Sequence, residues 1–381
     1  MTSDQSPMGT GTIDVDEMRD AVIAMHGLIN VDTAYTVYYD ETNNIRRLHV
    51  TPEGLNVGEP KCFVLGGIAH QGPVRDLGFD RLSSAFRLQP SAKEMKFPHL
   101  AKGDFLDVLG ASKVATLLEW LNAEGLFIHY EALDPLYWST VDIVDSILAE
   151  DDENPTLMMM GPALKNDLHG VLRADLTRMI DLFQRYTYPN VGRDRRKAFI
   201  SELLDALEAH RDEMEHFSFQ MLKGLLQIGR RLDRLPFLEE ERPNVLIDEF
   251  STFYLHRLCL LKNAQHVLDT EPVIIDRLEA MPLTLAGAPF RNFRFVARSE
   301  DEPGVQISDA IVGLVGKFYS WIIAAEMAEV VQARRSLSPR QEAGRKNLRR
   351  LVDRSIGQTP AFAHRVMSLA DQYKADRFLD G

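Results

Sequence analysis

Apolar residues in the first third of the chain recur mainly at the spacing of β-strands. A short amphipathic helix is predicted around Met18 to Leu28, and β-branched and aromatic residues then fill residues 34–40, 46–51 and 62–69. Turn-prone residues separate these three segments. We predict that they form an antiparallel meander, and that residues 126–133 form a further strand.

Helical periodicity dominates most of the remaining sequence. It predicts a helix over 104–123 and mainly helices of mixed charge from about 138 to 235. Two more strands are expected at 244–248 and 293–297, with a helix over 254–268 between them. An apolar helix containing Asp309 follows, and the tail from Pro339 is polar and helical.

This order of elements predicts an α/β protein with a mixed sheet, in which an antiparallel three-strand meander is joined by parallel strands. The RNase H fold has this order, here with a large helical insertion. Residues 1–12 have the composition of a disordered leader. The predicted divisions are leader and N-terminal helix (1–30), core, first part (31–137), helical insertion (138–240), core, second part (241–330) and basic helical tail (331–381).

Asp309 places a carboxylate inside the apolar helix. Gln306, Asp309, Gly313 and Gly316 share one stripe of that helix, and each glycine lowers helix stability by about 1 kcal/mol relative to alanine. We therefore expect the stripe to pack closely against another element. A buried carboxylate must be neutralised, hydrogen-bonded or bound to a metal. The alternative is an ordinary acid at a helix start.

Other acids stand where strands or loops end. Asp40 closes the first strand and is followed by Glu41, and Asp248 closes the strand at 244–248 and is followed by Glu249. Glu94 lies between two prolines, which excludes the middle of a long helix. Turn chemistry for Asp40 and a solvated surface position for Glu94 are the simpler alternatives.

Clustered carboxylates suit hard divalent cations. Mg²⁺ and Mn²⁺ prefer oxygen ligands, and two such ions about 4 Å apart can activate water and stabilise a leaving oxygen in phosphodiester cleavage. Acids held together without cations would raise one another's pKa. A two-ion site is therefore the hypothesis if these acids meet in space.

Several short motifs follow one another in order. They are Tyr39-Asp40-Glu41-Thr42-Asn43, Phe63-Val64-Leu65-Gly66-Gly67, Glu94-Met95-Lys96, Ile247-Asp248-Glu249, and Ser299 followed by Gln306-Ile307-Ser308-Asp309 with Gly313. The series resembles domain-of-unknown-function family 3800, a set of RNase H-like proteins, over about residues 35–320 without most of the insertion. Thr42-Asn43 stands where that family usually has Ser-Gly, and Ser308 where it has Ala. Neither departure removes a carboxylate.

The resemblance implies a metal-dependent, nuclease-type site that binds two Mg²⁺ or Mn²⁺ ions. Its expected catalytic acids and metal ligands are Asp40, Glu94, Asp248 and Asp309. Asp134, after the strand at 126–133, competes with Asp248 for the ligand position on the fourth strand of the fold, and Asp248 is preferred. The alternative acids are Glu41, Asp134 and Glu249. Lys93 and Lys96 are candidates for holding a scissile phosphate, although lysines beside a glutamate are commonly solvated.

Composition narrows the classes of binding partner and the cellular compartment that we expect. The chain has 381 residues and a net charge of −13, so no general attraction to nucleic acid or anionic membranes follows, and nucleic-acid contacts must be local. The two cysteines, Cys62 and Cys259, lack metal-ligand spacing, which argues against a cysteine zinc site or disulfide framework. We expect a cytoplasmic protein with no membrane segment.

Two basic clusters are candidates for phosphate contacts: residues 193–197 and the arginines of the tail. Solvated helix faces are the simpler interpretation of both. The leading hypothesis is an RNase H-like phosphodiesterase acting on DNA or RNA. The alternative is a non-catalytic scaffold or interaction subunit of a multi-protein system, which binds a protein partner through the helical insertion. A small phosphate ester is a third possible substrate of the same site.

Overall fold

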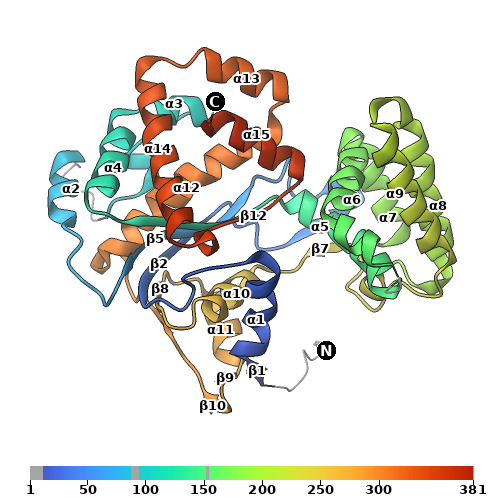
Figure 1. Cartoon of the computed structure of the whole chain (residues 1–381), viewed down its shortest axis with the longest axis horizontal. Helices are drawn as coiled ribbons and strands as arrows, with labels where there is room; N and C mark the ends of the chain where they lie inside the picture. Colours follow the sequence, from blue (N-terminus) through green and yellow to red (C-terminus); the bar gives the residue numbers. More distant parts are fainter. Residues whose placement is uncertain (1–11, 87–93, 152–153, 381) are drawn as a thin grey trace.

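A six-stranded mixed sheet forms the centre of the protein (Figure 1). The computed structural model describes residues 12–86, 94–151 and 154–380. All but the last residue of the expected disordered leader, and Lys93, lie outside these ranges. The strands in spatial order are β11 (Phe293–Phe295), β8 (Gln265–Leu268), β2 (Tyr35–Thr42), β5 (Phe63–Gln71), β6 (Phe127–Leu133) and β12 (Ala363–Val366).

The sheet combines antiparallel and parallel pairs. β5 runs antiparallel to both β2 and β6, whereas β8 is parallel to β2, β11 to β8 and β12 to β6. Most positions of β2 and β5 are buried, because helices cover both faces of the central strands. The predicted α/β class with a mixed sheet is confirmed.

The antiparallel meander contains different strands from those predicted. It consists of β2, β5 and β6, whereas the predicted second strand is β3 (Leu48–Thr51) in a separate sheet with β4 (Gly54–Leu55) and β7 (Val245–Ile247). The prediction that 244–248 lies inside the main sheet is therefore wrong: β7 pairs antiparallel with β3. A third small sheet contains β1 (Ile13–Asp14), β9 (Leu283–Leu285) and β10 (Ala288–Pro289).

The helix predicted over 254–268 ends early. The structure has α10 (Ser251–Leu260), a turn in which Ala264 N donates to Leu261 O at 2.9 Å, and then β8. The apolar run continues through Leu261 and hides this boundary in the sequence. As a result, β8 rather than β7 is the strand that lies next to β2.

Helices pack on both faces of the sheet (Figure 1). On the α12 face lie α12 (Pro303–Ala324), α3 (Phe105–Leu109), α4 (Ser112–Ala123), α14 (Pro339–Gln358), α2 (Phe79–Phe86), α13 (Met327–Arg335) and α15 (Leu369–Asp380). On the α10 face lie α10, α1 (Val15–His26) and α11 (Pro272–Ala280). The 3₁₀ helices are η1 (Phe97–His99), η2 (Arg211–Glu213), η3 (Pro236–Leu238), η4 (Ser299–Asp301) and η5 (Pro360–Phe362). The helix predicted over 104–123 is split into α3 and α4, and the tail contains β12, which was not predicted.

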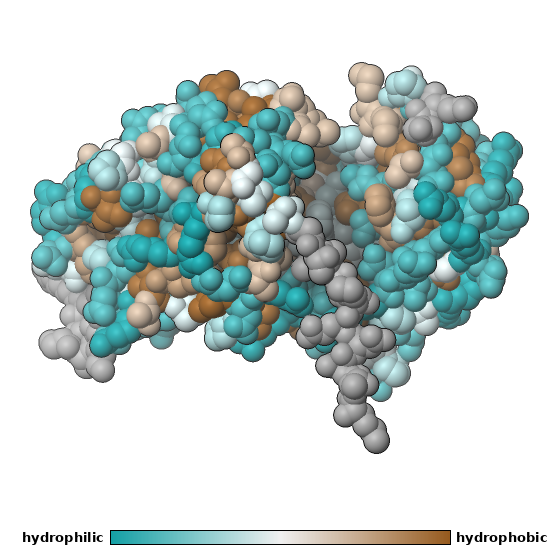
Figure 2. Space-filling model, turned by 90° about the horizontal axis from the view of Figure 1, so that it is seen from below, coloured by the Kyte–Doolittle hydropathy of each residue, from teal (hydrophilic) through white to brown (hydrophobic). Residues whose placement is uncertain are grey.

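A helical bundle lies beside the sheet. α5 (Pro135–Glu150) leads from β6 to α6 (Pro155–Ala174), α7 (Leu176–Tyr186), α8 (Arg193–Ala209) and α9 (His216–Arg231), so the predicted helical character of this region is confirmed. Figure 2 shows the surface hollowed between the bundle and the sheet-bearing part, with mainly hydrophilic side chains on the visible face of the bundle.

Helix α12 is a core element. Its length and apolar composition would suit a membrane span, but 67% of its most apolar window is buried inside the protein. Tyr319 and Phe318 of this helix belong to the hydrophobic core between α12 and the sheet. Burial in a protein core accounts for its hydropathy.

Candidate metal and catalytic site

Glycines bring α12 into close contact with β2. A β-carbon at Gly304 would lie 2.2 Å from the Tyr38 ring, and one at Gly316 would lie 2.5 Å from Cγ2 of Thr42. Real β-carbons do not approach other atoms so closely, so these two positions require glycine while the helix keeps its place. Gly316 belongs to the predicted stripe, as does Gly313, where a β-carbon would lie 2.4 Å from the Phe97 ring, so the expected close packing of the stripe is confirmed.

Ser308 fixes the position of α12 along the direction of β2. Its hydroxyl oxygen accepts a hydrogen bond from Ile68 N at 3.2 Å and lies 3.1 Å from the Tyr38 carbonyl oxygen. Asp309 is the next residue of α12. It lies between Ser308, which contacts Tyr38, and Gly316, which contacts Thr42 at the end of β2. This helix register places the Asp309 carboxylate at the level of Asp40.

The segment containing Glu94 is bound to the same stripe of α12. Gln306 Oε1 accepts a hydrogen bond from Met95 N at 2.7 Å, and Asp309 Oδ2 accepts one from Phe97 N at 2.5 Å. Residues three apart on a helix face the same way, so two side chains hold alternate amides of one extended segment. Asp309 lies well inside α12, which rejects the helix-start alternative.

Glu94 has two direct polar partners. Its carboxylate accepts a hydrogen bond from Ser299 Oγ at 2.7 Å and lies 3.1 Å from Lys96 Nζ. Partial burial alone would raise the pKa of Glu94, but these two partners outweigh it and lower the pKa. Glu94 foremost, and then Asp309 and Asp40, raise the pKa of Lys96. The ammonium of Lys96 therefore lies in the field of all three acids.

Asp40, which lies two residues before the end of β2, is adjacent to Asp269, which directly follows β8. β2 and β8 are parallel with Tyr39 opposite Leu268, and Asp269 N donates a hydrogen bond to Tyr39 O at 3.3 Å. The carboxyl ends of neighbouring parallel strands meet at one edge of a sheet, which is a common position for binding sites. Asp269 was not predicted, although Val267-Leu268-Asp269 has the same form as Leu246-Ile247-Asp248.

Electrostatics support one shared group of acids. Burial foremost, and then Asp309, raise the pKa of Asp40 well above its usual value, with Asp269 and Glu41 contributing. Burial likewise raises the pKa of Asp309; the Phe97 amide and Lys96 oppose this, and Asp269 adds to it. We use the name acid cluster for Asp40, Glu94, Asp269 and Asp309.

Asp248, the expected fourth ligand, lies elsewhere. Its carboxylate pairs with Arg47 Nη2 at 2.7 Å and Arg242 Nη1 at 2.6 Å, beside the small sheet that contains β7. The neighbouring Glu249 lies 3.7 Å from Arg277. The structure therefore does not bring Asp248 or Glu249 into the acid cluster, and Asp269 takes the place expected for Asp248.

The other alternative acids serve local roles. Glu41 points to the opposite face of the sheet from Asp40, where it accepts hydrogen bonds from the Tyr254 hydroxyl and from Asn44 Nδ2. Asp134 is fully buried at the start of α5, and it accepts a hydrogen bond from Leu136 N at 3.0 Å. Neither carboxylate joins the acid cluster.

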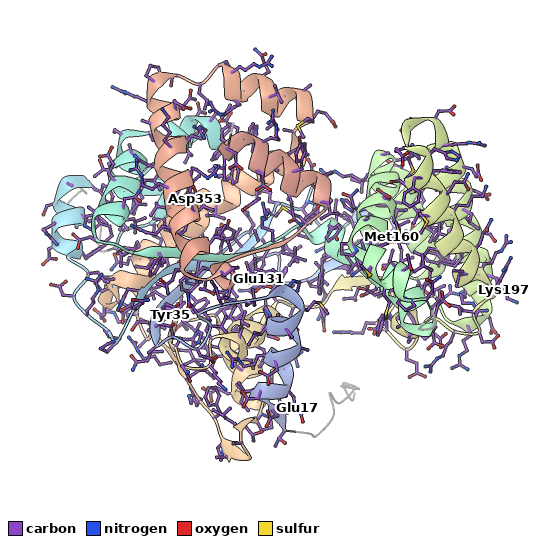
Figure 3. All side chains as sticks on the ribbon, in the orientation of Figure 1. Glu17, Tyr35, Glu131, Met160, Lys197 and Asp353 are labelled. Carbon is purple, nitrogen blue, oxygen red and sulfur yellow. The ribbon has the colours of Figure 1, made fainter. Side chains whose placement is uncertain are left out.

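The basic clusters also lie apart from these acids. Lys197 projects from the outer side of the bundle, far from the sheet (Figure 3). In the tail, Arg354 donates to the carbonyl oxygens of Leu121 and Asn122 at 3.1 Å each, and Arg349 pairs with Asp353. Arg349 thus agrees with the simpler interpretation of a solvated helix face with intrahelical pairs, whereas Arg354 is a structural residue that joins α14 to α4.

A cavity of about 410 Å³ adjoins the acid cluster. Its wall includes Thr42 at the end of β2 and Gly313 and Gly316 of α12, together with two lysines and two acids, Lys61, Lys317, Glu59 and Asp104. Gly66, the register partner of Asp40 on β5, carries no side chain that could cover the carboxylate.

The four acids spread over more than the space around one ion. Among the described residues, no three of them have ligand atoms that all lie within 4.8 Å of one another. In the structure as it stands, these four acids therefore do not form a compact three-ligand metal site. Comparison with models of protein families, with curated proteins and with solved structures gave no match to this chain.

Proposed function

We propose that the sheet is an RNase H-like core. The order β6-β5-β2-β8-β11, with three antiparallel strands followed by two parallel ones, supports this assignment. The bundle then enters the chain between β6 and β8 as an insertion, and β12 extends the sheet beyond the core. The motif resemblance to domain-of-unknown-function family 3800 agrees with this topology, once Asp269 replaces Asp248.

We further propose that the protein is a metal-dependent phosphodiesterase that acts on nucleic acid at the acid cluster. The observation that carries this proposal is the convergence of Asp40, Asp269 and Asp309, where burial foremost, and then repulsion from neighbouring acids, raise the pKa of Asp40 and Asp309. Buried carboxylates held close to one another without a counter-charge are stabilised when divalent cations bind. Two bound Mg²⁺ or Mn²⁺ ions would supply an activated water and a counter-charge for the leaving oxygen.

The protein's own groups orient this chemistry. Asp40 and Asp269 are fixed by the sheet, and Asp309 is fixed by α12 and by the Phe97 amide. Lys96, half exposed beside Glu94, can contact a phosphate oxygen of the substrate. The nearby cavity is lined by Lys61 and Lys317 but also by Glu59 and Asp104, so Lys96 is the basic residue that the proposal assigns to a nucleic-acid phosphate.

Activity of point variants tests the site. Purified protein with Mg²⁺ or Mn²⁺ is offered DNA, RNA, hybrid duplexes and small phosphate esters. Asp309→Asn, Asp40→Asn and Asp269→Asn are each expected to lower kcat/KM by about a thousandfold, because each removes a ligand. Asp248→Asn is the matched control, and it should keep activity within about twofold. Loss of activity in Asp248→Asn with full activity in Asp269→Asn would reverse the assignment.

The alternative is a non-catalytic interaction subunit, in which the bundle binds a protein partner through its exposed face. Thermal melting separates the two hypotheses, because a ligand that binds only the folded state raises the melting temperature. A functional acid cluster responds to Mn²⁺ in the wild type but not in Asp309→Asn. Absence of any response, together with an inactive wild type, would favour the interaction subunit.

A cytoplasmic location completes the proposal. Both cysteines are buried and unpaired, as suits a reducing compartment. Burial raises the pKa of the Cys259 thiol to about 11, so this group is neutral and unreactive at physiological pH. The nucleic-acid substrate is then an intracellular DNA or RNA.

A further inference from the structure

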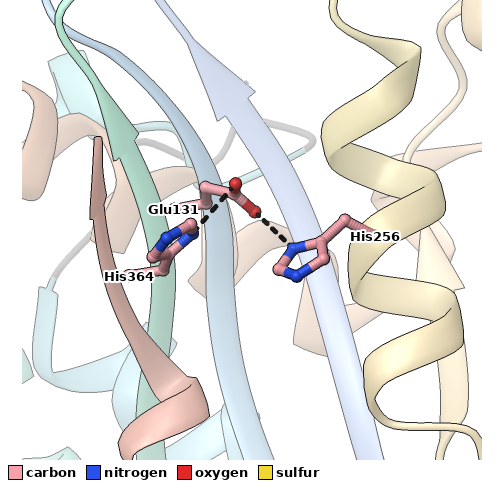
Figure 4. A group of neighbouring side chains, drawn as sticks. All are labelled: Glu131, His256 and His364. Atoms are coloured by element: carbon pink, nitrogen blue, oxygen red, sulfur yellow. Dashed lines mark hydrogen bonds and ion pairs between the residues drawn. The ribbon is translucent and has the colours of Figure 1, made fainter. Parts of the chain in front are cut away.

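Glu131, His256 and His364 meet on the face of the sheet that α10 covers (Figure 4). Glu131 lies on β6, and His364 is its register partner on the parallel strand β12, so both side chains leave the sheet on the same face. His256 comes from α10, which packs there. One ligand atom of each residue lies within 4.8 Å of the other two. We call these three residues the histidine site.

The carboxylate of this site is deeply buried and incompletely bonded. The Glu131 side chain is 2% exposed. Its Oε1 lies 3.0 Å from His364 Nδ1, whereas Oε2 lies 3.7 Å from His256 Nδ1 and has no hydrogen-bond partner. A buried carboxylate oxygen without a partner is unfavourable, because it has lost its water without gaining a hydrogen bond. A cation between the three residues would satisfy it.

The negative charge of Glu131 could be balanced by such a cation. Within the described residues, the ion-pair partners of Glu131 are these two histidines alone, which are charged only when protonated. Another buried group, Asp134 with His169 and Asp371, differs in this respect. There Arg173 lies 3.6 Å from Asp134 and Lys374 lies 2.7 Å from Asp371, so two fixed cations already balance two carboxylates.

The donor set indicates which ion fits. Two imidazole nitrogens and one carboxylate oxygen suit a borderline ion such as Zn²⁺ better than Mg²⁺, which prefers oxygen ligands throughout. Sites with three protein ligands commonly leave a position for water. His256 and His364 are 22% and 42% exposed, so solvent can reach such a position.

We propose that Glu131, His256 and His364 form a Zn²⁺ site, with water completing the coordination. The ion would join three elements that are remote in the sequence: β6, α10 and β12. This site is independent of the acid cluster, since it lies on the other face of the sheet and offers nitrogen ligands. Its main consequence is to hold the C-terminal strand β12 to the sheet edge.

Metal titration of chelator-treated protein tests the proposal. Zn²⁺ is expected to raise the melting temperature of the wild type, and Co²⁺ used as a spectroscopic probe is expected to give visible d–d absorption bands. His364→Ala and His256→Ala should weaken Zn²⁺ binding by at least about tenfold and remove the Co²⁺ bands. Because His364 is partly exposed, its replacement should leave the fold intact, which circular dichroism checks.

Two controls separate this site from other metal binding. His26→Ala changes an exposed histidine at the end of α1 and should bind Zn²⁺ like the wild type. Asp40→Asn should lose the Mn²⁺ response and keep the Zn²⁺ response, so failure of one site is distinguishable from failure of the other. Equal Zn²⁺ affinity in the wild type, His256→Ala and His364→Ala would overturn the proposal, as would absence of Zn²⁺ binding to the wild type.

Discussion

The two faces of the sheet carry opposite kinds of chemistry. On the α12 face, Asp40 and Asp309 meet other acids, and burial with like charge raises their pKa. On the α10 face, burial alone would raise the pKa of Glu131, but the two histidines outweigh it and lower the pKa to about 2. The same type of side chain is thus driven in opposite directions by its neighbours.

Strand alternation produces this division. Successive side chains of a strand point to opposite faces, so Asp40 and Glu41 separate, as do Tyr130 and Glu131. Tyr130 bonds Tyr319 of α12, whereas Glu131 faces α10. A functional side chain is therefore placed by its position in the strand as much as by its type.

The largest expected effect concerns the tight contact on the α12 face. Gly67 has φ +153°, and a β-carbon there would lie 2.1 Å from Ser308 Oγ and 2.4 Å from Tyr38 O. Gly67→Ala should lower the free energy of unfolding by about 4 kcal/mol, because backbone strain and overpacking add. Urea denaturation measures the change.

Gly58→Ala is the matched control for that substitution, since a β-carbon at Gly58 would meet no other atom within 4 Å. It should change stability by less than about 0.5 kcal/mol. If Gly67→Ala were equally mild, α12 would have room to shift, and the placement of Asp309 beside Asp40 would not be rigid.

Local pattern predicted one half of the acid cluster. The stripe of Gln306, Asp309, Gly313 and Gly316 is visible because helical periodicity is a local property, and its close packing follows from the glycines. Asp40 was identified in the same way, as the end of a strongly apolar strand. For these residues, the local sequence predicts both the secondary-structure element and the face of that element on which the side chain lies.

The other half depends on long-range pairing. β7 and β8 are both short strands whose last two residues are apolar and are followed by an acid, and their pairing partners decide which acid lies beside Asp40. β8 was further concealed by the apolar run that continues from α10. The histidine site was missed for a related reason, since His364 lies on a four-residue strand within a tail that reads as helical.

An intermediate effect is expected from a buried histidine of the α10 face. His266 Nε2 lies 3.1 Å from Leu261 O and donates to it, so Nδ1 accepts from the Tyr39 hydroxyl at 2.9 Å. Burial foremost lowers the pKa of His266 to about 3. The unfolded chain binds a proton near pH 6.5, so stability is lost as the pH falls from there towards 3.

At pH 4 this linkage removes about 3 kcal/mol from the wild type relative to neutral pH. His266→Gln cannot bind that proton, so its stability should fall less steeply between pH 7 and pH 4, whatever its absolute value. Urea denaturation across that range gives both slopes, with the exposed-histidine variant His26→Gln as control. Identical slopes in His266→Gln and wild type would show that this histidine is not held neutral.

The smallest expected effect is on stability, and it tests whether the negative charge of Asp40 destabilises the folded protein in the absence of cations. The raised pKa of Asp40 means that the folded protein binds this proton more tightly than the unfolded chain, so its contribution to stability is lost as pH rises through the folded pKa. Without divalent ions at pH 7.5, Asp40→Asn should therefore be more stable than the wild type by about 1 kcal/mol, as is common for functional sites. Asp248→Asn, which instead loses ion pairs with Arg47 and Arg242, should show no such gain. A less stable Asp40→Asn under these conditions would mean that this carboxylate already has favourable partners, and the α12 face would then have no need of a cation.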